Sequence, residues 1–186
     1  MPDAIHARYQ ELAEQVKAMA PKGPVLKTDG WQEENNFNPI PADYYIETRR
    51  EAVELVKAFG YKAEVGDIRD MAAFEDGKFA ALIDTSTIDH VPDYAKALDE
   101  YRRVLKPGGA ILVVVFLTTD RSHYTQLILR YLGDGILNRN YLQFYFNDAE
   151  FRREMDARFE IEQVINLEHK REKGYLVAFI GKKKEA

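Results

Sequence analysis

The sequence predicts an α/β fold in which helices cover both faces of a mostly parallel sheet. From residue 24 onward, short apolar segments alternate with amphipathic helical segments, which is typical of parallel sheets. The run 110–116 is continuously apolar, as expected of a central strand that is covered on both faces. Two apolar segments near the end, 159–167 and 174–180, predict an antiparallel hairpin that makes the sheet mixed at one edge.

An amphipathic helix over residues 3–20 opens the predicted fold. Its apolar side chains recur at intervals of four, three and four residues and form one stripe: Ile5, Tyr9, Leu12 and Val16. Asp3 is a suitable N-cap, and the Pro- and Gly-containing segment 21–24 ends the helix. We expect this stripe to pack on the sheet.

Four strands and one helix follow in the first half of the chain. The strands are expected at 24–27, 43–47, 61–65 and 79–84. The helix before the third strand is predicted to begin at a capping box of Thr48 and Glu51 and to end at Gly60. The connection 28–43 is long enough for a parallel crossover, which needs about a dozen residues.

The second half predicts three more helices around the central strand. One begins at Pro92 and buries a face that includes Tyr101, and a tight turn at 106–109 leads into the central strand. The later segments are expected to be a helix at 124–132, a loop at 138–140, a helix at 148–155 and a hairpin turn at 169–173.

Composition excludes several classes of function. The 186 residues fit one domain, and the absence of cysteine excludes a disulfide scaffold, a thiolate zinc site and a cysteine nucleophile. The net charge of −5 lacks the basic surface that nucleic-acid binding needs. We find no signal peptide, and the longest apolar run, 109–117, is about half of a membrane span. We therefore expect a cytoplasmic protein without a nucleic-acid or membrane partner.

Four segments in order carry polar residues beside predicted strand ends: 65–70, 74–79, 85–92 and 105–109. Over about residues 25–116, the chain resembles the middle of class I S-adenosylmethionine-dependent methyltransferases that have a small, type 11-like methyltransferase domain. The resemblance implies a Rossmann-like, doubly wound, mostly parallel seven-stranded sheet with an antiparallel last strand and helices on both faces. It implies S-adenosyl-L-methionine as cofactor. It also divides the single domain 1–186 into an N-terminal helix, a cofactor-binding half and a substrate-side half: 1–23, 24–117 and 118–186.

The resemblance assigns cofactor contacts to the ends of the second and third strands. Ligands of open α/β sheets bind beyond the carboxyl ends of the strands. Glu47 is expected to accept two ribose hydroxyls beside Thr48; alternatively, it only supports the next helix N-terminus. Asp67 is expected to accept the adenine amino group while the backbone N–H of Ile68 meets the ring; alternatively, Gly66 and Asp67 only form a turn.

The residues that follow the first and fourth strands allow more than one interpretation. Asp84 and Thr85 would lie under the sulfonium, or Asp84 would simply cap its strand. Thr28, Asp29 and Gly30 stand where the family has a Gly-x-Gly-x-Gly loop. Either these residues rebuild the cofactor loop, with Asp29 accepting from the cofactor ammonium, or the chain is a catalytically inactive methyltransferase-like binding or interaction protein. A nicotinamide-dependent enzyme is disfavoured because Gly-x-Gly-x-x-Gly is absent.

The expected reaction is in-line methyl transfer to a small-molecule acceptor, in which the protein mainly positions the reactants. A general base is needed only if the acceptor must lose a proton; His90 is the candidate, against a plain packing or capping role before Pro92. The acceptor side is expected at Asn138, Arg139, Tyr141 and Tyr145, whose aromatic rings could equally be ordinary core. No residues have convincing metal-ligand spacing, and the sequence leaves the acceptor atom and the oligomeric state open.

Overall fold

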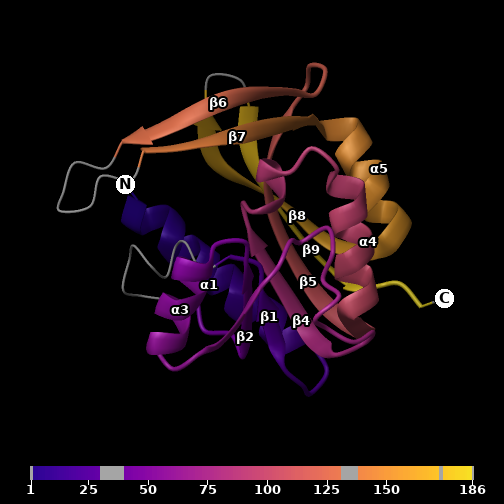
Figure 1. Ribbon diagram of the computed structural model, residues 1–186. Helices are drawn as coiled ribbons and strands as arrows, with labels where there is room; N and C mark the ends of the chain where they lie inside the picture. The colour runs from indigo at the N-terminus through magenta and orange to yellow at the C-terminus, as the bar shows by residue number, and fades with distance from the viewer. Residues whose placement is uncertain (1, 30–39, 131–137, 172–173, 186) are drawn as a thin grey trace.

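The computed structural model describes residues 2–29, 40–130, 138–171 and 174–185. Its helices are α1 (Pro2–Met19), α3 (Arg50–Ala58), α4 (Tyr94–Val104) and α5 (Asp148–Arg158), with a short 3₁₀ helix η1 (Ile88–His90). Its strands are β1 (Val25–Lys27), β2 (Tyr44–Glu47), β3 (Lys62–Val65), β4 (Phe79–Thr85), β5 (Leu105–Thr118), β6 (His123–Arg130), β7 (Asn138–Asn147), β8 (Phe159–Arg171) and β9 (Gly174–Lys183). Figure 1 shows their arrangement.

Seven of these strands form the expected mixed sheet, in the order β3-β2-β1-β4-β5-β9-β8. The five strands from β3 to β5 in this order run parallel to one another. Strand β9 runs antiparallel to both β5 and β8. The predicted fold class is therefore confirmed, including the antiparallel last strand.

Helices cover both faces because the side chains of β5 alternate between two apolar clusters. Ile111 and Val113 belong to the cluster under α4 and α5, and Leu112 and Val114 belong to the cluster under α1. Helix α3 lies on the α1 side, where Val53 packs near Tyr45 of β2. Figure 1 shows α4 and α5 on one side of the sheet and α1 and α3 on the other.

Strands β6 and β7 form an antiparallel ribbon, and this corrects two expectations. Residues 124–130 of the helix expected at 124–132 lie in strand β6, and residues 131 and 132 lie outside the described residues. The loop expected at 138–140 begins strand β7. A short apolar run such as 127–129 is compatible with a helix or a strand, and here pairing with β7 makes it a strand. The ribbon joins the main sheet where Leu117 pairs with Phe146, beyond the carboxyl end of β4.

Two helices begin differently from their predicted starts. The capping box is wrong: α3 has Arg49 at its N-cap, without a side-chain cap among the described residues. Thr48 donates its hydroxyl hydrogen bond to Glu47 instead. Helix α4 begins at Tyr94 rather than Pro92, because the Asp93 carboxylate accepts a hydrogen bond from the third backbone N–H beyond it.

Candidate functional site

The carboxyl ends of β1, β2, β3 and β4 lie at one edge of the sheet, because these strands are parallel neighbours. This edge brings together most of the predicted cofactor residues: Thr28, Asp29, Glu47, Thr48, Asp67, Ile68, Asp84 and Thr85. Gly30 lies outside the described residues. The placement follows from sheet topology, since each residue ends or follows a strand at its carboxyl end.

Glu47 ends β2 with a largely buried side chain, 9% exposed. Its Oε1 accepts hydrogen bonds from the backbone N–H of Arg49 at 3.1 Å and from Arg49 Nε at 3.3 Å, and its Oε2 accepts from Nη2 at 3.1 Å. Burial raises the pKa of Glu47, but the Arg49 charge and hydrogen bonds outweigh it, so this pKa lies below its usual value. Glu47 is therefore held as a carboxylate.

Asp67 follows β3 and repeats this arrangement with Arg69. Its Oδ1 accepts from the backbone N–H of Arg69 at 2.8 Å and from Nε at 3.0 Å, and its Oδ2 accepts from Nη2 at 2.6 Å. The hydrogen bonds from Arg69 lower the pKa of Asp67. The next side chain, Ile68, is 5% exposed and anchors the turn in the core. The Gly-Asp turn exists, and its carboxylate remains 35% exposed.

Thr28 and Asp29 leave β1 towards the neighbouring strands. Thr28 is buried, donates to Thr87 Oγ1 at 3.1 Å, and accepts on its carbonyl from that hydroxyl at 2.9 Å. A hydrogen bond with Asp29 is among the interactions that lower the pKa of Glu47. The fully buried Lys27, which sequence reasoning missed, donates to the Asp29 carbonyl at 2.7 Å. The altered first motif is therefore tied to the ends of β2 and β4.

Asp84 is buried at the end of β4, as is Thr85. Its Oδ1 accepts from the backbone N–H of Thr87 at 2.8 Å, and its Oδ2 accepts from the Tyr101 hydroxyl of α4. Burial raises the pKa of Asp84 to about 6, with a small further contribution from the Asp89 charge. The Asp84 carboxylate thus caps the turn after β4 from inside the protein, and a direct cofactor contact would have to displace these donors.

That turn carries two buried oxygen atoms without a hydrogen-bond partner in the described structure: Ser86 Oγ and Asp89 Oδ1. Ser86 also has a φ of 70°, which is uncommon for a residue other than glycine. The other oxygen of Asp89 accepts from Gln143 Nε2 at 2.9 Å and from the Phe116 N–H at 3.3 Å. Burial raises the pKa of Asp89. The sequence signal for Asp89 was the Asp89-His90 dipeptide, from which sequence reasoning selected only His90 as a candidate.

His90 and Tyr145 lie where the ribbon meets this turn. The exposed His90 has its Nδ1 2.9 Å from the carbonyl oxygen of Leu142, so Nδ1 carries a hydrogen. Tyr145 is buried on the α1 side and stacks on His123, with ring centroids 5.1 Å apart. The backbones of the other acceptor-side candidates lie in β7, and their side chains are outside the described part: Asn138, Arg139 and Tyr141.

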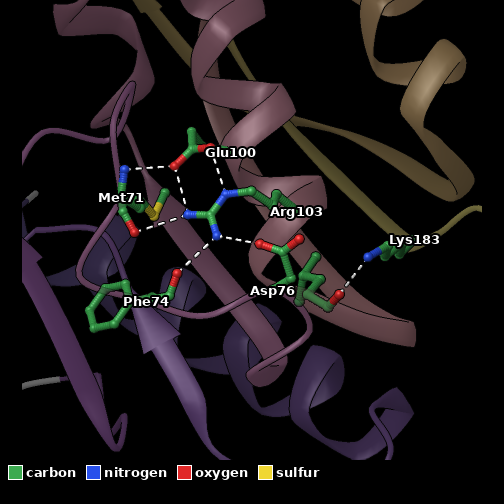
Figure 2. Close-up of polar contacts among 7 residues, drawn as sticks. Met71, Phe74, Asp76, Glu100, Arg103 and Lys183 are labelled. Atoms are coloured by element: carbon green, nitrogen blue, oxygen red, sulfur yellow. Dashed lines mark hydrogen bonds and ion pairs between the residues drawn. The ribbon is translucent and has the colours of Figure 1, made fainter.

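Arg103 of α4, which sequence reasoning also missed, holds the loop between β3 and β4. Figure 2 shows its guanidinium between Glu100 and the loop carbonyls of Met71 and Phe74, with Asp76 on the outer side. Glu100 Oε2 also accepts from the Met71 N–H at 2.6 Å. This cluster fixes the segment that begins with the Asp67 turn.

The described residues contain no group of three or more His, Cys, Asp or Glu side chains suited to holding a metal ion. Nor does the described part contain a helix long and apolar enough to cross a membrane.

Comparison with known proteins matches residues 41–113 to a methyltransferase domain family. A chloroplastic tocopherol O-methyltransferase of Arabidopsis thaliana is 34% identical over 76 residues, which are 40% of this chain and 22% of that protein. The chain thus matches about a quarter or less of the length of its curated relatives.

Solved structures share the fold over nearly the whole chain. An S-adenosylmethionine-dependent methyltransferase of Thermotoga maritima is 22% identical, with a TM-score of 0.64 over 95% of this chain and 89% of that one. A 1,6-didemethyltoxoflavin-N1-methyltransferase of Burkholderia thailandensis, with bound 1,6-didemethyltoxoflavin and S-adenosylhomocysteine, is 14% identical, with a TM-score of 0.64 over 96% and 77%.

The matched segment runs from the strand that carries Glu47 to the centre of β5, and so contains the ends of β2, β3 and β4. The sheet around it is mostly parallel with an antiparallel last strand, as the resemblance implied. Residues 41–113 thus match the methyltransferase domain family, and the whole chain shares its fold with S-adenosylmethionine-dependent methyltransferases of known structure.

Proposed function

We propose that this protein transfers a methyl group from S-adenosyl-L-methionine to a small-molecule acceptor. One observation carries the proposal: two carboxylates, Glu47 and Asp67, lie at the carboxyl ends of adjacent parallel strands within the family-matched segment. Both have lowered pKa values and are ionised at neutral pH. Ionised acceptors at this edge suit the hydroxyl and amino donors of an adenosine.

The residues present fit the cofactor at its adenosine end. Glu47, beside Thr48, would accept the ribose hydroxyls, and Asp67 with the N–H of Ile68 would meet adenine. The interaction of Asp29 with Glu47 supports a rebuilt first loop, because it places that loop beside the ribose carboxylate. Thr28 and Gly30 would complete this loop at the methionine end.

The carboxyl end of β4 would contribute mainly by shaping the turn that follows it. Asp84 keeps its oxygens on Thr87 and Tyr101, so we propose that it and Thr85 shape the turn under the methionine part from inside. His90 remains the proposed base where the acceptor must lose a proton. Its Nδ1–H bond to the Leu142 carbonyl would leave the lone pair of a neutral ring at Nε2.

The cofactor would supply an activated methyl group on sulfur, so the chain's task is alignment of the acceptor with it. The acceptor side would comprise β7, where Tyr145 is buried, together with Asn138, Arg139 and Tyr141. A net charge of −5 and the absence of cysteine support a small-molecule acceptor in the cytoplasm over a nucleic acid.

Calorimetric titration with S-adenosylhomocysteine tests this proposal. We expect the wild type to bind, and Glu47→Ala to bind about 5- to 150-fold more weakly, the equivalent of losing about 1–3 kcal/mol at a charged hydrogen-bonding group. The matched control is Glu51→Ala, which removes an exposed carboxylate on α3 near Glu47. Equal affinity in Glu47→Ala would remove Glu47 from the site, and no binding by the wild type at millimolar ligand would reject the cofactor.

The alternative is an inactive methyltransferase-like binding protein, which the altered first motif and the two arginine-bound carboxylates favour. Incubation with radiolabelled S-adenosylmethionine and a deproteinised small-molecule extract separates the two. Label transferred to any product supports methyl transfer, whereas cofactor binding without transfer supports the alternative.

A further inference from the structure

Each of the two carboxylates proposed to bind the adenosine is followed, two residues later, by an arginine that returns to it. Glu47 and Arg49 at the end of β2 repeat the geometry of Asp67 and Arg69 after β3. In both pairs the arginine donates its backbone N–H as well as its guanidinium. The two pairs nevertheless differ in how much of the carboxylate they occupy.

Glu47 has no remaining capacity for two hydroxyls. An ionised carboxylate offers about four lone-pair positions. Glu47 Oε1 accepts from Thr48 Oγ1 at 3.2 Å and from two nitrogens of Arg49, and Oε2 accepts from a third nitrogen of Arg49. A ribose diol that takes both oxygens must therefore displace a donor, and the Arg49 guanidinium is the largest one that can move.

Asp67 retains a position for one more donor. Oδ1 accepts two hydrogen bonds from Arg69, but Oδ2 accepts only the bond from Nη2 within the described residues. The Asp67 side chain is also 35% exposed, against 9% for Glu47. An adenine amino group needs one acceptor, which Oδ2 can provide while Arg69 stays in place.

The bond lengths also indicate that the Glu47–Arg49 ion pair opens more easily than the Asp67–Arg69 pair. The guanidinium of Arg49 lies 3.1–3.3 Å from Glu47, longer than the about 2.7–2.9 Å typical of charge-assisted bonds. The guanidinium of Arg69 lies 2.6–3.0 Å from Asp67. The first ion pair is the looser of the two and is the easier one to open.

We propose that the ribose displaces the Arg49 guanidinium from Glu47, whereas Arg69 stays on Asp67 and orients it toward adenine. Arg49 is thus an internal competitor of the cofactor, and Arg69 is a positioning residue. The inference rests on the proposed function and adds a difference in sign: loss of Arg49 strengthens cofactor binding, and loss of Arg69 weakens it.

The experiment is a calorimetric titration of the full chain with S-adenosylhomocysteine. We expect Arg49→Ala to bind about two- to fivefold more tightly, the range that corresponds to one loosely held ion pair which the ribose no longer has to open. We expect Arg69→Ala to bind at least fivefold more weakly. Arg50→Ala is the control, because it removes the same charge one residue further, on the exposed side of α3, and should not change affinity.

A second readout uses the wild type and needs no variant to fold. In nitrogen-15 NMR spectra, saturating S-adenosylhomocysteine should speed solvent exchange at the Arg49 Nε–H and leave the Arg69 Nε–H protected. Weaker or unchanged binding by Arg49→Ala, or an Arg49 Nε–H that stays protected, overturns the competitor role. Unchanged or tighter binding by Arg69→Ala overturns its positioning role. Absence of binding by the wild type instead rejects the proposed function.

Discussion

Tyr101→Phe provides a sharp test of the charge buried at the end of β4. The substitution removes the hydroxyl that donates to Asp84 Oδ2 and leaves the ring in the core. Burial raises the pKa of Tyr101 well above its usual value, so this hydroxyl is a donor at every pH of interest. Burial raises the pKa of Asp84 to about 6, so the group that accepts the bond changes charge within an accessible range.

The magnitude of the effect therefore depends on pH. At pH 8 the variant loses a bond to a carboxylate, about 1.5–3 kcal/mol, whereas at pH 5 it loses a bond between neutral groups, about 0.5–1.5 kcal/mol. The wild type also carries a linkage term. Because the folded pKa of Asp84 lies above the ordinary 3.8, stability that is present below pH 3.8 is lost as the pH rises from there to about 6, by roughly 3 kcal/mol in all. The substitution raises this pKa further and deepens the loss.

Urea denaturation at pH 5 and pH 8 measures both terms. We expect Tyr101→Phe to cost about 1 kcal/mol more at pH 8 than at pH 5. Tyr94→Phe is the control, because Tyr94 lies on the same helix and its ring packs on Phe146 and Phe151. Equal costs at the two pH values, or a greater cost at pH 5, would refute the assignment of Asp84 as a buried ionised acceptor.

Three further predictions concern other parts of the fold. Gly174→Ala should destabilise the protein by about 1–3 kcal/mol in urea melts, because its Cβ would lie 2.5 Å from the Tyr145 ring; an unchanged midpoint would contradict this contact. Arg103→Lys should speed hydrogen exchange at the Met71 amide, since an ammonium cannot bind Glu100 and the Met71 carbonyl together as the guanidinium does. Unchanged protection of this amide would show that Arg103 does not hold the loop. Asp89→Asn should raise stability by about 1 kcal/mol at pH 8, because it removes a buried charge with an unpartnered oxygen; a loss at pH 8 would argue against that charge.

The main sheet could be predicted because its signals are local. Short apolar strands, a continuous central strand and acids at strand ends follow from period and position alone. The sequence pattern also allows the direction of the Asp84 side chain to be predicted. Leu82 packs in the cluster under α4, and side chains two residues apart in a strand lie on the same face. Because Tyr101 lies on the apolar face of α4, this alternation places Asp84 against Tyr101.

The missed features depend on competition between partners. Thr48 looks like an N-cap, but the carboxylate at the end of β2 takes the N–H of Arg49 and the Thr48 hydroxyl together. The ribbon β6–β7 was mistaken for a helix and a loop because its register is set by pairing with a distant strand. The first outcome is a competition among three consecutive residues, which propensity alone does not decide, and the second depends on a strand outside any local window.

The position of β9 governs the order in which this chain can fold. Leu112 of β5 pairs with Ile180, and Ile180 pairs in turn with Gln163 of β8. Strand β8 is synthesised first but reaches the sheet only through β9, so it has no docking place until β9 has formed. Contacts of such long sequence separation slow folding. A ribosome-bound chain that ends before residue 174 would therefore keep the edge of β5 open, and that edge is where chaperone binding or mispairing should concentrate during synthesis.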